Sequence, residues 1–90
     1  MTARRFRVEG DVQGVGFRAY AVRSAVLLGI AGEVWNTRDG AVEVYGQHVD
    51  ANVLEAFADR LRRGPGQVDS VSAEPSEPRL VQGFAISSTR

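Results

Sequence analysis

The order in which helical and strand periodicities alternate along the chain is the feature that most limits its fold. Apolar residues recur at helical spacing over residues 17–28 and 52–63, and each segment carries an apolar stripe. Strand patterns occupy residues 4–9, 31–36, 41–45, 68–73 and 84–88. The resulting β-α-β-β-α-β-β order, with a hairpin between the helices, fits a split βαβ, ferredoxin-like sandwich. We therefore predict an α+β fold whose mostly antiparallel sheet carries both helices on one face.

Local signals indicate where these elements begin and end. Gly29 is the expected C-cap of the first helix. Asn52 and Glu55 resemble a capping box at the start of the second helix, which Gly64-Pro65-Gly66 stops. The Asp39-Gly40 pair supplies the hairpin turn. A chain of 90 residues is expected to form one domain, residues 1–90.

The connection between the first strand and the first helix carries the most chemical information. Residues 12–18 read Val-Gln-Gly-Val-Gly-Phe-Arg. Gly14 and Gly16 allow positive φ angles, so that several N–H groups can point at one anion. Arg18 adds a planar fork of donors near the positive end of the helix. A Gly-x-Gly pair also occurs in simple tight turns, and it is Arg18 that favours an anion-binding loop.

Composition excludes several kinds of chemistry. The chain has no cysteine, which excludes a thiolate phosphoenzyme, and its single histidine, His48, excludes a zinc site made of clustered histidines. We expect His48 to lie in a solvated connector and Ser24 to be packed rather than nucleophilic. Zero net charge argues against nucleic-acid binding. Residues 1–9 lack the apolar segment of a secretory signal, so we expect a cytoplasmic protein without membrane contact.

Two separated motifs resemble those of the acylphosphatase family. Residues 10–18 are similar to its signature loop, residues 32–43 to its second motif, and residues 84–86 suit its last strand. The resemblance implies a ferredoxin-like domain that hydrolyses the carboxyl-phosphate anhydride of acyl phosphates without a metal or organic cofactor. It also implies that Arg18 binds the phosphate and that Asn36 holds the attacking water. The phosphate-binding residues would be Gln13, Gly14, Val15, Gly16, Phe17 and Arg18.

Other polar and aromatic residues near the second motif leave alternatives open. Asp39 is expected to form the turn and Glu43 to be an exposed strand residue, rather than either acting on the water. Trp35 could stack on a substrate or fill the hydrophobic face. Glu33 and Trp35 depart from the family, which commonly has an aromatic residue and then a basic one at these positions, and this departure leaves the substrate preference open.

The resemblance implies a small-molecule acyl phosphate as the substrate. Inorganic phosphate or sulfate is expected to compete with it, because the N–H groups and the guanidinium of the loop recognise any tetrahedral anion. We expect a monomer. The alternative is a non-catalytic module that keeps the phosphate loop and binds a phosphorylated or carbamoylated partner, because fold and loop do not entail turnover. The presence of Asn36 favours an enzyme over such a module.

Overall fold

A computed structural model describes residues 1–90 and has the predicted order of helices and strands. The elements are β1 (Thr2–Asp11), α1 (Phe17–Leu28), β2 (Ala31–Asn36), β3 (Val42–His48), α2 (Ala51–Arg62), β4 (Gln67–Ser76) and β5 (Phe84–Ile86). The five strands form one sheet in the order β4-β1-β3-β2-β5. All neighbouring strands are antiparallel except β2 and β5, which are parallel. The predicted ferredoxin-like arrangement is confirmed.

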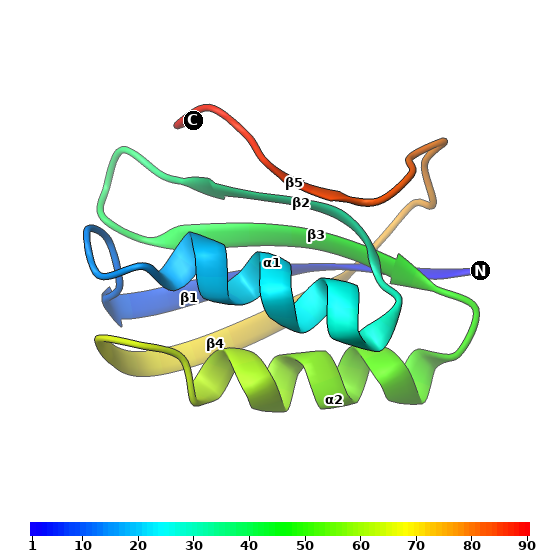
Figure 1. Cartoon of the computed structure of the whole chain (residues 1–90), viewed down its shortest axis with the longest axis horizontal. Helices are drawn as coiled ribbons and strands as arrows, with labels where there is room; N and C mark the ends of the chain where they lie inside the picture. The colour runs from blue at the N-terminus through cyan, green and yellow to red at the C-terminus, as the bar shows by residue number, and fades with distance from the viewer.

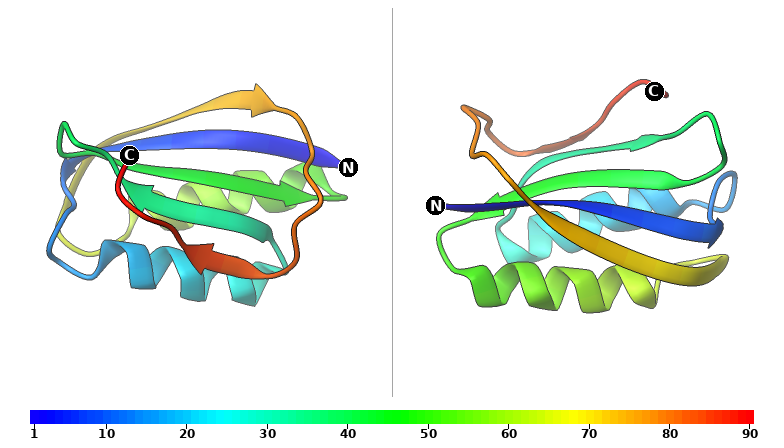
Figure 2. Two further views of the ribbon diagram at one scale, coloured as in Figure 1. Left: turned by 90° about the horizontal axis from the view of Figure 1, so that it is seen from above. Right: turned by 180° about the vertical axis from the view of Figure 1, so that it is seen from behind.

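Both helices lie on one face of the sheet (Figures 1 and 2). The main core fills the space between the helices and the sheet. It consists of inward-facing strand residues such as Phe6 and Val44 together with the apolar stripes of the helices. Phe57 of α2 lies edge to face with Phe6 and with Phe84, at centroid distances of 5.4 and 6.0 Å. These contacts fix α2 across the sheet. Neither helix is both long and apolar enough to cross a membrane.

Several element boundaries differ from the sequence predictions. Helix α2 begins at Ala51, and its N-cap is Asp50, whose side chain accepts a hydrogen bond of 2.9 Å from the Asn52 N–H. The predicted capping box at Asn52 is therefore wrong. Strand β3 continues to His48, so this residue ends a strand instead of lying in a connector. Strand β4 continues through Pro75, which it can accommodate because β4 is an edge strand with one free side.

The other face of the sheet carries no helix, and we call it the open face (Figure 2). Trp35 and Tyr45 are buried there in a small cluster with Ala3. The guanidinium of Arg90 lies 4.0 Å from the centroid of the Trp35 ring, on which Arg5 also packs. Arginine side chains therefore cover the aromatic rings where a helix would otherwise be needed. Of the two alternatives for Trp35, the structure shows the one in which it fills a hydrophobic face.

Candidate active site

The loop between β1 and α1 has the backbone conformation of an anion-binding turn. Gly14 and Gly16 have φ angles of 75° and 84°, and Gly16 is the N-cap of α1 without any side-chain cap. None of the N–H groups from Gln13 to Ala19 donates to a backbone carbonyl. Unpaired N–H groups at a helix start suit an anion, which can accept from several of them and is favoured by the helix dipole.

A cavity of about 160 Å³ opens at this loop. It is lined by Val12, Gly14, Gly16, Phe17, Arg18, Ala19 and Ile86. Arg18 is half-buried and forms no ion pair, whereas Arg5 and Arg7 of the open face are both paired with carboxylates. The donors of Arg18 are therefore available to a ligand in this cavity.

The side chain of Gln13 links the loop to the β2–β3 turn. Its side-chain Nε2 donates to the carbonyl oxygens of Thr37 and Ala41, each at 2.8 Å. The amide side chain is thus committed to the β2–β3 turn, and Gln13 has only its backbone N–H to offer an anion. These two bonds also hold the loop against the strand end that carries Asn36, and the loop and turn lie together at one end of the molecule, on the left in Figure 1. Nothing in the residue spacing predicted this link.

Asn36 is the last residue of β2. It lies two positions after Val34, which packs in the main core, so the Asn36 side chain is on the helix-covered face. Its Oδ1 is buried and has no hydrogen-bond partner in the protein. A buried acceptor of this kind is costly unless a donor such as water reaches it. Asn36 does not line the 160 Å³ cavity, but it directly precedes Thr37, whose carbonyl oxygen accepts a hydrogen bond from Gln13 of the loop.

Val15 and Phe17, the remaining predicted loop residues, contact the turn after α2. A side chain at Gly64 would place its Cβ 2.4 Å from the Phe17 ring, and one at Gly66 would meet Val15 at 2.8 Å. Val15 is outside the cavity lining, whereas Phe17 is in it. The sequence predicted Gly64 and Gly66 only as a helix stop, but their small size also lets this turn approach the loop.

Glu33 and Trp35 do not flank the Asn36 side chain, because alternation along β2 places both on the open face. Glu33 pairs with Arg79 and Arg90, each at 2.8 Å, and accepts a hydrogen bond from Ser87. The Ser87 hydroxyl and the Arg90 guanidinium hold the pKa of Glu33 below its ordinary value, against the effect of burial. Glu33 therefore links residues 79–90, which we call the C-terminal segment, to β2.

Arg90, at the end of this C-terminal segment, is hydrogen-bonded to the backbone of Asn36. The Arg90 N–H donates to the Asn36 carbonyl oxygen at 2.9 Å, and the Arg38 N–H donates to the Arg90 carbonyl at 3.0 Å. The alternation of side chains along a strand would have been enough to predict that Glu33 and Trp35 lie on the face opposite Asn36. The position of Arg90, more than fifty residues along the chain, had no local signal.

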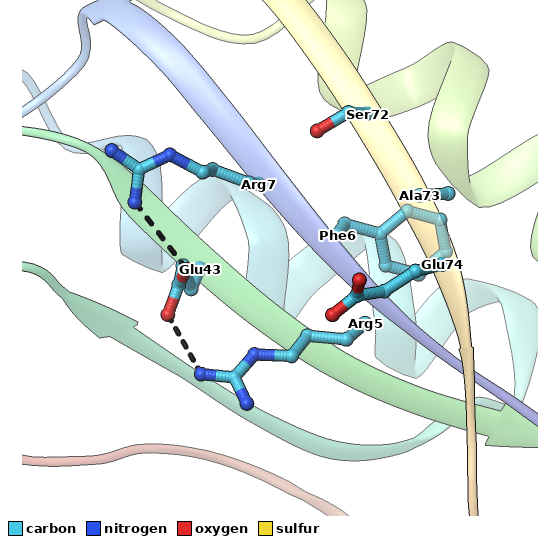
Figure 3. A pocket seen from close by; sticks show the side chains of 7 residues that line it. All are labelled: Arg5, Phe6, Arg7, Glu43, Ser72, Ala73 and Glu74. Atoms are coloured by element: carbon cyan, nitrogen blue, oxygen red, sulfur yellow. Dashed lines mark hydrogen bonds and ion pairs between the residues drawn. The ribbon is translucent and has the colours of Figure 1, made fainter.

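Glu43 lies in a second cavity, of about 190 Å³, on the open face (Figure 3). It was expected to be exposed, but its side chain is only 17% exposed, between Arg5 at 2.9 Å and Arg7 at 3.3 Å. Burial raises the pKa of Glu43, and the two arginines outweigh this effect and lower it. Because Glu43 occupies donors of both arginines, and Glu9 and Asp39 also pair with Arg7, this cavity is poorly suited to recruiting a phosphate.

The remaining polar candidates, Asp39, Ser24 and His48, occupy structural rather than catalytic positions. The Asp39 carboxylate accepts from the Thr37 hydroxyl and pairs with Arg7 at 2.6 Å, and these contacts lower its pKa, which confirms its place in the turn. Ser24 is fully buried on α1. His48 pairs with Thr2 in the sheet, at the end of β1 away from the loop. No group of three or more His, Cys, Asp or Glu side chains is arranged to hold a metal ion.

Comparisons with known proteins identify the family of this chain and relatives with the same fold. The acylphosphatase family model matches residues 4–86. An acylphosphatase of Thermotoga maritima is 41% identical over 88 residues, which cover 96% of this chain and 97% of that protein. The crystal structure of the Bacillus subtilis acylphosphatase is similar with a TM-score of 0.92 and 32% identity, covering 97% of this chain and 99% of the other.

A third similarity is to part of a larger protein. Full-length HypF, crystallised in a phosphate- and nucleotide-bound form, matches with a TM-score of 0.80 and 29% identity. The match covers 98% of this chain and 12% of HypF. The family model and the full-length relatives agree over almost the whole sequence, and this chain therefore belongs to the acylphosphatase family.

Proposed function

We propose that this protein hydrolyses the carboxyl-phosphate anhydride bond of acyl phosphates to a carboxylate and inorganic phosphate. Family membership supports this function, and one structural observation carries it: the N–H groups from Gln13 to Ala19 lack backbone partners beside an unpaired Arg18. Donors fixed in this way suit the charge on the oxygens of a transferring phosphoryl group.

In the proposed reaction the loop N–H groups and the Arg18 guanidinium hold the phosphoryl oxygens by charge-assisted hydrogen bonds. Phosphoryl transfer passes through a loose transition state, so positioning and charge stabilisation supply most of the rate enhancement. The leaving carboxylate is a weak base, and its departure needs no general acid. The site can therefore be chemically sparse, and the proposed mechanism uses no metal ion.

We assign the attacking water to Asn36, whose buried and unpartnered Oδ1 supports this role because it can accept a hydrogen bond from the water. An amide has no basic group with which to remove the proton. As the water oxygen bonds to phosphorus, the bond from phosphorus to the carboxyl oxygen breaks and its electron pair leaves with the carboxylate. The proton of the water passes to a phosphoryl oxygen of the substrate.

A non-catalytic phosphate-binding module would need the loop and Arg18 but not Asn36. In such a module a buried Asn36 Oδ1 without a partner would serve no purpose, and this feature favours hydrolysis. The two functions are also separable by experiment, since both predict phosphate binding and only one predicts turnover.

Release of inorganic phosphate from acetyl phosphate, compared with p-nitrophenyl phosphate and with a chelator present, tests the proposal. We expect acetyl phosphate to be hydrolysed at the same rate with and without chelator, and the monoester to be almost inert. Loss of the rate with chelator, restored by a divalent cation, would contradict the metal-independent mechanism. Phosphate binding without any turnover would favour the binding module.

A further inference from the structure

The cavity at the phosphate loop has an apolar rim that phosphate binding does not use. Of the apolar side chains in its lining, Val12 and Phe17 are buried in the core. Ala19 is exposed, and Ile86 is 50% exposed. Both lie in the same lining as Arg18. The rim thus places an exposed isoleucine next to the side chain that is proposed to bind the phosphoryl group.

The sheet register fixes the direction of Ile86. It pairs with Val34 in the parallel ladder between β5 and β2, and the Ser87 N–H donates to the Val34 carbonyl at 2.8 Å. Paired residues of neighbouring strands point to the same face of a sheet. Ile86 therefore projects toward the first turn of α1, on the face that also carries Asn36.

The size of the cavity limits what it can enclose. Its volume of about 160 Å³ is below the roughly 300–1,000 Å³ of sites that bury a drug-sized ligand. A phosphoryl group held by the loop and Arg18 would leave little room for the rest of an acyl phosphate. The acyl group must then extend over the rim, where Ile86 and Ala19 are the exposed apolar side chains.

We propose that Ile86, with Ala19 beside it, forms a wall that contacts the acyl group and favours acyl phosphates with a large apolar acyl group over those with a small one. This inference rests on the proposed function. Arg18 is the only charged side chain in the lining, and it is assigned to the phosphoryl group. No other side chain of the lining can recognise a polar substituent on the acyl group, so selectivity at the rim depends on apolar contact.

The kinetic test compares benzoyl phosphate with acetyl phosphate in Ile86→Ala and Ile86→Val variants. We expect Ile86→Ala to lower kcat/KM for benzoyl phosphate roughly three- to tenfold more than for acetyl phosphate, below the upper range for a fully enclosed pocket because the wall is half-exposed. Ile86→Val should have a smaller effect in the same direction. Inhibition by inorganic phosphate, which has no acyl group, should not change.

Leu27→Ala is the matched control, because it removes the same number of carbon atoms from a side chain that is 69% exposed near the far end of α1. It should change neither substrate's kcat/KM. An equal effect of Ile86→Ala on both substrates, or the same selective loss in Leu27→Ala, would overturn the wall. Thermal unfolding of each variant separates a loss of contact from a loss of fold.

A binding measurement keeps this inference distinct from the proposed function. Benzylphosphonate and methylphosphonate differ in their apolar group and are not acyl phosphates. The difference between their affinities therefore measures apolar contact with Ile86 without any turnover. We expect Ile86→Ala to weaken benzylphosphonate selectively. If that occurs in a protein that hydrolyses no acyl phosphate, the wall stands and the proposed function fails. If acyl phosphates are hydrolysed but neither comparison shows selectivity for Ile86, the wall is wrong.

Discussion

Arg18 differs from the arginines of the open face in having no carboxylate partner. Arg7, for comparison, is held by Asp39, Glu9 and Glu43. The sequence pointed to Arg18 through a local signal, namely its position at the start of a helix directly after two glycines. It could not show that Gln13 turns its side chain away into the β2–β3 turn, because that contact joins residues far apart in the chain.

We expect Arg18→Ala to weaken the binding of inorganic phosphate roughly 10- to 100-fold, as for the loss of a hydrogen bond to a charged group. Arg18→Lys should not restore full affinity, because an ammonium lacks the planar fork. Calorimetric titration with phosphate measures both. Arg23→Ala, on an exposed arginine of the same helix, is the control and should bind like the parent. A fully retained affinity in Arg18→Ala would remove Arg18 from the site.

The elements of the fold were predictable in type and order because each shows its own periodicity. Their ends were less predictable, since β3 and β4 are lengthened by their pairing with β1, over residues 2–8 and 3–11 of that strand respectively. The approach of the turn after α2 to the phosphate loop was also missed. It depends on Gly64, whose role is to leave space for the Phe17 ring, and a sequence shows a glycine without showing what lies against it.

We expect Gly64→Ala to destabilise the protein by about 1–3 kcal/mol, because the new Cβ would overlap the buried Phe17 ring. This corresponds to a fall in Tm of about 4–8 °C for each kcal/mol. The same substitution in a Phe17→Leu background should cost less, since the smaller side chain gives way. Thermal unfolding of the four proteins in this cycle measures the coupling. Costs that simply add would show that the overlap is not the cause.

Across the whole molecule, the two faces of the sheet are stabilised in different ways. The helix-covered face has an apolar core, whereas the open face has a layer of arginines and carboxylates over Trp35 and Tyr45. The helix-covered face was predictable from apolar periodicity. The ion pairs of the open face were not, because they join β1 to β3 and β2 to the C-terminal segment.

This layer makes a pH dependence of stability expected. The pKa values of Glu33 and Glu43 are lower in the folded protein than their ordinary values, so the folded state binds fewer protons than the unfolded one near those pKa values. Their stabilising effect is complete above the unfolded pKa of about 4.3 and is lost as the pH falls through the folded values. Tm should therefore drop as the pH is lowered below about 4.

Glu43→Gln tests the origin of this effect. At pH 7 it should lower the stability by about 1–2 kcal/mol, through the loss of charged hydrogen bonds to Arg5 and Arg7. The difference in Tm from the parent should shrink as the pH falls below 4, because the parent carboxylate is then protonated as well. Glu77→Gln, at an exposed residue, is the control. A Tm difference that stays constant with pH would contradict the role of the Glu43 charge.

The most direct test of the proposed mechanism is the turnover of acetyl phosphate by an Asn36→Ala variant, with phosphate affinity and Tm measured on the same preparation. Since Oδ1 of Asn36 has no partner in the protein, its removal should leave the fold and most of the phosphate affinity intact. We expect kcat to fall roughly 10²- to 10³-fold, as for the loss of one oriented polar group in other active sites. Asn52→Ala, at an exposed asparagine of α2, should turn over like the parent. Hydrolysis by Asn36→Ala at the parent rate would contradict the assignment of the water to Asn36.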